Sequence, residues 1–273
     1  MAIGFSLLWQ TSRTINFAQG EFVTIPAFLM VLLFLLLRLP FALALILTIL
    51  GSSFLLGFLM KKTLVESLIE EGILPLVVAT IAVAFLVRDS LIVFWTPEAL
   101  FFPSVISKKP LHLGGATFSS LDLWNISIAV LMILGLQLLI KRTKAGKALQ
   151  AVAQNREAAG ILGIDVSTMI LLAFVINAVL SAASAVLIAP IYMVKYDMGV
   201  ELGLKAFYAA IIGGFNEVRG ALVGGLLVGV IETFTAAYIS TQYKGAFVLL
   251  VLIAVIIFKP EGLLGKRELY EYR

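Results

Sequence analysis

The residues of this chain that could do chemistry are a few amide and ionisable side chains set in strongly apolar sequence. Asn16, Phe17, Gly20 and Glu21 lie close together, just before an apolar segment. If a helix is broken here, the Asn16 carboxamide, the backbone around Gly20 and the Glu21 charge could line a polar passage. The alternative is an N-cap and loop at the membrane surface, with Glu21 at the positive end of the following helix.

A second candidate segment covers residues 205–232, where glycine pairs and a charged turn interrupt apolar sequence. In a bilayer core no water satisfies backbone groups, so such a break survives only when it is buried in protein or lines a wet cavity. We therefore predict that Gly213 and Gly214 line a transport path. Other glycines of the segment have the small-xxx-small spacing of close helix packing, a role compatible with lining a cavity. The pairs with this spacing are Gly220 with Gly224 and Gly225 with Gly229.

Three further charged residues fall inside apolar segments. Glu232 is a functional candidate because an isolated charge is costly in a membrane. A structural ion pair with Lys205 or Lys244 is favoured over substrate contact. Arg88 and Asp89 are adjacent, so they point to different sides of a helix and indicate a helix break or contacts with a partner.

Most catalytic chemistry is excluded by the composition. Cysteine is absent and His112 is the only histidine, which removes thiol catalysis, disulfides and any histidine-based metal site or triad. No nucleophile–base pair, metal-ligand set or phosphate-binding loop is evident. We expect neither an enzyme nor a metal or cofactor site, and any ATP must be consumed by another chain.

The composition predicts an integral membrane protein. Hydrophobic residues make up 61% of the 273 residues and charged residues 13%, with a mean hydropathy of +1.08, whereas about a quarter of residues are charged in a soluble domain. The net charge of +4 does not indicate nucleic acid, because the basic residues gather in a few loops between apolar spans.

A helix needs about 20 apolar residues to cross the hydrocarbon core, and the chain predicts an all-α polytopic helical bundle with about seven or eight membrane segments. The predicted spans are residues 22–37, 41–60, 73–95, 121–140, 169–193, 220–240 and 245–258. Residues 205–215 are too short for a crossing and fit a broken or re-entrant helix. Residues 1–10 are apolar but fit neither a full span nor a signal peptide, so we expect the chain to begin inside a helix.

The orientation follows from lysine and arginine in short loops. The basic groups at residues 61–62, at 141–156 and in the tail at 259–273 are separated by an even number of predicted crossings, so all three belong in the cytoplasm. The loop at residues 96–120 then lies outside, with Lys108 and Lys109 as a minor exception.

The longest basic loop predicts a short helix along the membrane surface. Residues 148–159 are good helix formers without proline or glycine. Gly160 and Gly163 then permit a turn, and Asp165 or Ser167 can cap the next span. On spacing alone, a solvated positive-inside loop is an equal alternative.

Four blocks, in order along the chain, resemble the LivH-type permease of branched-chain amino-acid ABC importers: residues 15–21 (INFAQGE), 157–164 (EAAGILGI), 205–232 and 260–265 (PEGLLG). The resemblance implies one transmembrane permease domain over residues 1–273 of a plasma-membrane protein, with a cytoplasmic coupling loop at 141–168, a truncated first helix and a cytoplasmic C-terminus. It also implies a LivM-type second permease, two cytoplasmic ABC ATPases and an extracytoplasmic solute-binding protein.

The resemblance further implies that the loop contains a coupling helix that fits a groove in the ATPase. The implied coupling residues are Arg156, Glu157, Ala158, Ala159, Gly160 and Gly163. Small alanine side chains would allow close approach, and Arg156 and Glu157 could pair with polar groups of the partner.

Two other functions stay open. An ion-coupled secondary transporter could use Glu232, Asp89 or Glu21 to carry a proton, although it has no ATPase for the long basic loop to contact. Permeases similar to this family also carry urea, short amides or other amino acids. The resemblance implies leucine, isoleucine and valine as substrates.

Overall fold

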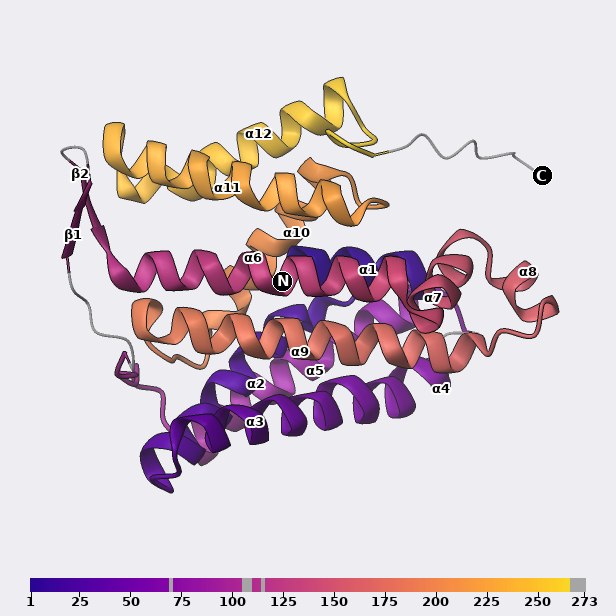
Figure 1. The fold of residues 1–273 in the computed structure, drawn as a ribbon, viewed down its shortest axis with the longest axis horizontal. Coiled ribbons are helices and arrows are strands. Elements are labelled where there is room, and N and C mark those ends of the chain that lie inside the picture. Colours follow the sequence, from indigo (N-terminus) through magenta and orange to yellow (C-terminus); the bar gives the residue numbers. More distant parts are fainter. Residues whose placement is uncertain (69–70, 105–109, 114–115, 266–273) are drawn as a thin grey trace.

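Roughly parallel helices form the body of the molecule (Figure 1). The computed structural model describes residues 1–68, 71–104, 110–113 and 116–265. The helices are α1 (Ala2–Ser12), η1 (Phe17–Gly20), α2 (Glu21–Met30), η2 (Val31–Leu36), α3 (Phe41–Ser52), η3 (Ser53–Leu59), η4 (Lys61–Val65), α4 (Glu66–Leu68), α5 (Ile73–Phe94), α6 (Ser120–Arg142), α7 (Lys144–Gln154), α8 (Arg156–Ile161), α9 (Val166–Tyr192), α10 (Met198–Gly213), α11 (Val218–Tyr238), η5 (Thr241–Tyr243) and α12 (Lys244–Phe258).

Seven helical stretches in the described part of the chain are long and apolar enough to cross a membrane. They are Phe17–Leu36, Phe41–Leu68, Ile73–Phe94, Ser120–Arg142, Val166–Tyr192, Val218–Tyr238 and Thr241–Phe258. Each contains or overlaps one of the predicted spans, so the prediction of a polytopic helical bundle is confirmed. The sequence did not predict the short hairpin of β1 (Pro110–Leu113) and β2 (Ala116–Ser119), which are antiparallel strands.

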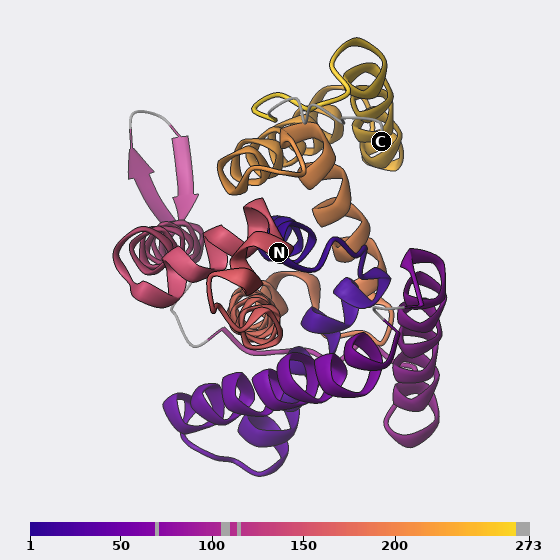
Figure 2. The same ribbon diagram turned by 90° about the vertical axis from the view of Figure 1, so that its right-hand side faces the viewer.

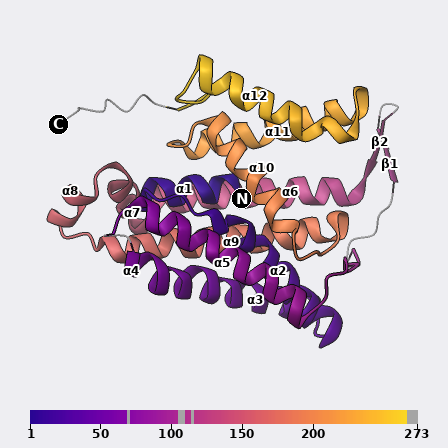
Figure 3. The ribbon, with the colours of Figure 1, turned by 180° about the vertical axis from the view of Figure 1, so that it is seen from behind.

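The hairpin and the α7–α8 segment lie at opposite ends of the helices (Figure 3). The predicted ends of two segments are wrong. The second span continues as helix beyond residue 60 to Leu68, because the ammonium of Lys61 is paired and can remain buried inside it. Residues 205–213 of the short predicted segment belong to α10, which begins at Met198 and ends at Gly213.

Helix α10 has 16 residues, which corresponds to about 24 Å and is shorter than the hydrocarbon core of about 30 Å. It packs against α11 on one side and against α1 and η1 on the other. Figure 2 shows α10 joining the α11–α12 pair to the N-terminal helices. Lys108, Lys109 and residues 266–273 of the predicted basic tail lie outside the described residues.

Helix α1 lies in the interior, packed against α9, α10 and α11. Five aromatic rings join it to α10 and the turn that follows, with centroid distances of 5.2–6.1 Å. These rings belong to Phe5, Trp9, Phe17, Phe207 and Phe215. The Ser6 hydroxyl also donates to the Phe215 carbonyl at 2.7 Å, so α1 is fixed to the end of α10.

Candidate functional site

A cavity of about 210 Å³ lies where the first membrane span is interrupted. Its walls come from α1, from η1 and the start of α2, from α5 and from α10. Asn16, Phe17, Gly20 and Glu21 all line it. The structure thus brings together the four residues that the sequence placed in the first candidate segment, and their role in translocation stays a prediction.

The break is produced by local backbone conformation. Arg13 ends α1 in the left-handed region, with φ of 48°. Asn16 is extended and its side-chain oxygen accepts from the Ala18 N–H at 3.0 Å, which starts η1. Both features stop α1 from continuing into α2 as one helix, so the backbone of residues 13–16 is available to line a cavity.

Glycines allow η1 to cross α10 in backbone contact. A Cβ atom on Gly20 would lie 2.4 Å from the carbonyl oxygen of Gly199, and one on Gly203 would lie 2.9 Å from the Gly20 nitrogen. The sequence analysis missed Gly199 and Gly203, although their spacing is the small-xxx-small pattern of close helix packing. Their absent side chains allow the broken segment to form one wall of the cavity.

A buried amide pair holds η1 against α9. The Gln19 side-chain nitrogen donates to Asn177 Oδ1 at 3.0 Å, and the Asn177 nitrogen donates back to Gln19 Oε1 at 2.9 Å. A Cβ atom on Gly4 would lie 2.0 Å from Asn177 Oδ1, so α1 meets the same pair. Both side chains are fully enclosed, and neither amide could be left unpaired without cost.

We expect Gln19→Leu or Asn177→Leu alone to lower the stability of the protein by about 1–3 kcal/mol, because each leaves a buried amide unsatisfied. The double variant should lose less than the sum of the two single variants. Thermal unfolding in detergent micelles measures all three. Additive losses would show that the two amides do not act as a pair.

Two polar atoms on the cavity lining have no hydrogen-bond partner among the described residues. They are Oε2 of Glu21 and Nδ2 of Asn16, on side chains only 2% and 4% exposed. Arg88 of α5 lines the same cavity, with its guanidinium 4.8 Å from the Phe85 ring centroid. Its Nε lies 3.6 Å from Asp89 Oδ1, so the two adjacent side chains form an ion pair, although only Arg88 lines the cavity.

Gly213 and Gly214 lie outside this cavity. A Cβ atom on Gly213 would lie 1.8 Å from the Gly220 carbonyl oxygen, which places Gly213 at the contact of α10 with α11. Gly214 has φ of +112° and allows the chain to turn between the two helices. Gly224 also packs on α10, whereas Gly225 and Gly229 have no atom close to where a Cβ would be, so packing explains only the first predicted glycine pair.

Glu232 also lies outside the cavity, in an ion pair that joins α11 to α10. Its carboxylate is 3.0 Å from Lys205 Nζ, and Glu201 approaches the same ammonium at 2.8 Å. Lys244 lies 3.7 Å from Glu201. This geometry is the structural pair with Lys205 that the sequence analysis favoured.

The predicted surface helix is two helices, because Asn155 interrupts it. Asn155 is extended, with φ of −154°, and its side chain accepts from the Ala158 N–H to start α8. Glu157 and Ala158 are exposed, while Ala159 is buried. Gly160 lies within α8, which ends at Ile161, and Gly163, with φ of +83°, turns the chain toward α9.

Arg156 points inward, away from the surface that a partner would contact. Its Nε donates to the Thr11 carbonyl at 2.9 Å, which satisfies a carbonyl in the last turn of α1. Burial lowers the pKa of the Arg156 guanidinium, and the nearby Arg13 charge adds to this effect. Arg156 therefore connects α8 to the helix that lines the cavity.

For the ATP-driven transport that the resemblance implies, Arg156→Gln should reduce the amount of cargo moved per ATP by about tenfold, because a charged hydrogen bond of about 1.5 kcal/mol between α8 and α1 is lost. ATP hydrolysis should continue. Uptake and phosphate release, measured on the same vesicles, give the ratio. Arg142→Gln, at an exposed position at the end of α6, is the matched control, and an equal ratio in both variants would contradict the connection.

Two large apolar side chains of the same loop are exposed to an unusual degree. Ile161 is 86% exposed and Leu162 is 79% exposed. They were not singled out from the sequence, although they stand next to each other directly after the polar and small residues 154–160. Side chains of this kind outside the spans mark a protein interaction site.

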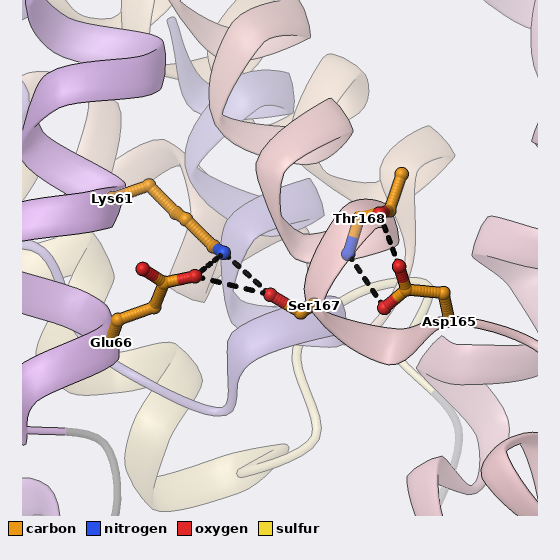
Figure 4. A network of polar contacts seen from close by, with 5 residues as sticks. All are labelled: Lys61, Glu66, Asp165, Ser167 and Thr168. Atoms are coloured by element: carbon orange, nitrogen blue, oxygen red, sulfur yellow. Dashed lines mark hydrogen bonds and ion pairs between the residues drawn. The ribbon is translucent and has the colours of Figure 1, made fainter.

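A polar network beside α8 joins the second span to the start of α9 (Figure 4). The Lys61 ammonium pairs with the Glu66 carboxylate and donates to the Ser167 hydroxyl at 2.6 Å. Asp165 caps α9 by accepting from the Thr168 N–H and hydroxyl, and these bonds hold its pKa below the usual range. The capping prediction is confirmed for Asp165, and the chain that follows α8 is anchored to the second span.

Similarity to known proteins extends over most of the chain. Residues 1–256 match the family described as the permease component of the branched-chain amino acid transport system. The permease protein BraD of a high-affinity branched-chain amino acid transport system in Pseudomonas aeruginosa is 29% identical over 280 residues, which cover 98% of this chain and 91% of BraD.

Two further relatives are named LivH. The permease protein LivH of Escherichia coli K12 is 37% identical over 142 residues, 52% of this chain and 46% of its own length. A probable LivH of Methanocaldococcus jannaschii is 24% identical over 277 residues, 97% of this chain and 87% of its own length. No solved structure matches the chain significantly.

Proposed function

Because this chain belongs to the family of permease components of branched-chain amino acid transport systems, we propose that it forms one half of a passage for leucine, isoleucine and valine. The chain is a multi-pass membrane component of an ABC transporter, without catalytic activity of its own. The cargo is proposed from the names of the relatives, which are branched-chain amino acid permeases.

The cavity at the broken first span is the observation that carries this proposal. It combines irregular backbone at membrane depth with buried polar groups, and such a combination is tolerated only in protein or beside water. It lies between helices α1 and α10, and α10 is not among the helices long enough to cross a membrane. Discontinuous helices of this kind form substrate sites in transporters.

The proposed partners are a LivM-type second permease, two cytoplasmic ABC ATPases and an extracytoplasmic solute-binding protein. The rim of the cavity supports a second permease, because Phe85, Val200 and Leu204 are about half exposed there. A partner that packs beside these side chains would close the cavity toward lipid and leave the passage between the two chains. The exposed surface of α8 and of residues 161–162 supports contact with an ATPase.

We place the α7–α8 end of the molecule in the cytoplasm. Lys141, Arg142, Lys144 and Lys147 gather there, as the positive-inside rule requires of a cytoplasmic end. The C-terminal end of α12 lies at the same end of the bundle (Figure 1). The chain would then present its C-terminus to the cytoplasm and the β1–β2 hairpin to the exterior.

The proposed mechanism is alternating access. When ATP closes the two ATPases, they move α8, and Arg156 passes this movement to α1 through the Thr11 carbonyl. Because α1 leads into η1 and is packed on α10, the walls of the cavity shift together. The passage then opens to one side of the membrane at a time.

Uptake by the reconstituted complex tests the proposal. We expect proteoliposomes that contain this permease, the second permease, the ATPases and the binding protein to accumulate labelled leucine only when ATP is supplied on the side of the membrane that carries the ATPases. A proton uncoupler should have no effect. Unlabelled isoleucine and valine should compete, whereas urea and acetamide should not. Uptake that stops with the uncoupler but survives ATP depletion would favour a secondary transporter instead.

A further inference from the structure

We propose that the cavity beside η1 binds the cargo directly as a zwitterion, with Glu21 contacting the ammonium group and Arg88 contacting the carboxylate. This inference rests on the proposed function and adds the site that recognises the amino acid within the membrane. The observation behind it is that one small cavity holds one buried carboxylate and one guanidinium among apolar walls.

Glu21 has the properties of a ligand-binding group. It is 2% exposed, and its Oε2 has no hydrogen-bond partner among the described residues. A buried polar atom left without a partner is costly, and native structures keep such an atom where it serves a function. The orphaned nitrogen of Asn16 lies on the same cavity and can donate a hydrogen bond to the cargo.

Arg88 supplies the opposite charge from a different helix. It lines the cavity from α5, while Glu21 lines it from the start of α2. Its guanidinium contacts Asp89 through Nε and lies over the Phe85 ring. A guanidinium has five N–H donors arranged to bind a carboxylate. The ion pair with Asp89 through Nε therefore leaves other N–H donors of Arg88 for a second carboxylate.

The pairing of charges selects a class of cargo. A cavity with one acid and one base is complementary to a molecule that carries both charges, because Glu21 can contact its ammonium group and the guanidinium of Arg88 can contact its carboxylate. The remaining walls are apolar, with Phe5, Ile81 and Phe207 among them. They fit an aliphatic side chain, and the volume of about 210 Å³ equals the liquid volume of about seven water molecules.

Recognition by these groups must be weak, because cargo that enters a passage also has to leave it. We expect affinity in the millimolar range, about 4 kcal/mol. Weak binding agrees with a cavity that encloses the cargo only in part, since Val200 and Leu204 on its rim are about half exposed. Specificity within the membrane would then add to that of the solute-binding protein.

Protection of a single cysteine tests this site, since the chain contains no native cysteine. Val200→Cys on the cavity rim is placed in the permease–ATPase complex, without the solute-binding protein, and its alkylation is followed by mass spectrometry at residue 200. Leucine should slow the alkylation. Isopentylamine, without the carboxylate, and 4-methylpentanoate, without the ammonium group, should each require about tenfold higher concentration for equal protection.

Variants then assign each charge. In the Val200→Cys background, Glu21→Gln should weaken protection by leucine about tenfold, and so should Arg88→Gln. Asp122→Asn, at an exposed position of α6 and absent from the cavity lining, is the matched control and should protect as the parent does. Gln242→Cys, at an exposed position of η5 and absent from the cavity lining, should show no protection.

Two outcomes would overturn the inference: equal protection by all three ligands, or no protection by leucine at either Val200→Cys or a second reporter, Leu204→Cys. The same cysteine variants, assembled with the binding protein, are assayed for ATP-driven leucine uptake. Uptake without protection refutes the zwitterion site alone. Absence of leucine uptake by the cysteine-free parent complex refutes the proposed function itself.

Discussion

Replacing Leu162 with aspartate is expected to abolish ATP-dependent uptake while leaving the membrane spans folded. Leu162 and its neighbour Ile161 are the most exposed apolar side chains of the α7–α8 segment. Covering a leucine with a partner protein contributes about 1.5–3 kcal/mol, and a buried, unpaired aspartate costs more than that. The two effects together should weaken binding of the ATPase by at least about a hundredfold.

Copurification of the ATPase with the permease measures this loss directly. Thermal unfolding of the permease alone should not change, because Leu162 contacts little of its own chain. Ala145→Asp, at an exposed position in the first turn of α7, is the control for an added negative charge in the same loop. If Leu162→Asp retained the ATPase as well as Ala145→Asp does, residues 161–162 would not be part of the interface.

A methyl group at Gly199 should destroy the crossing that forms the cavity. Its Cβ would lie 2.2 Å from Thr24 Oγ1 and 2.4 Å from the Gly20 carbonyl oxygen. Thr24 could change rotamer, but the obstacle at Gly20 is backbone, so η1 and α10 would have to move apart. Overpacking of this kind costs about 3 kcal/mol, a large fraction of a total stability of about 5–15 kcal/mol.

We therefore expect Gly199→Ala to lower the thermal unfolding temperature in detergent and to reduce uptake below a tenth of the parent level. Gly225→Ala is the matched control, because a Cβ there meets no atom within 4 Å. It should be neutral, or more stable by up to about 1 kcal/mol as alanine favours helix. Equal stability of the two variants would contradict the close crossing of η1 and α10.

The membrane spans could be predicted from sequence because long apolar runs leave few alternatives to helix in a bilayer. The ends of the spans were harder to predict. The span that begins at Phe41 continues through Lys61 because Glu66 and Ser167 pair with its ammonium group. No local sequence pattern indicates these partners. The break at Asn155 was missed for a related reason, since an asparagine side chain can cap a new helix within a helix-forming sequence.

The glycine pairs show where spacing stops being informative. Gly220 and Gly224 lie against α10, but Gly225 and Gly229 do not. Successive residues are about 100° apart around a helix, so adjacent glycines cannot both face the same neighbour. The sequence gives the spacing but does not say which side of the helix is covered.

The candidate site was predictable in part. Asn16, Phe17, Gly20 and Glu21 stand together in the sequence and all line the cavity. The α10 wall and Arg88 come from distant parts of the chain, and their approach depends on packing of the whole bundle. That Glu21 and Arg88 line the same cavity could therefore be found only from the three-dimensional structure.

The central claim is that the cavity at the broken first span is the passage for cargo. Phe17→Cys, on the cavity wall of a chain that has no other cysteine, can be tested with a membrane-impermeant thiol reagent applied to one side of sealed vesicles at a time. We expect the cysteine to react with reagent added on one side of the membrane in the nucleotide-free complex. In the complex trapped with a nonhydrolysable ATP analogue, it should react with reagent added on the other side. A cysteine that no reagent reaches from either side in either state would contradict it.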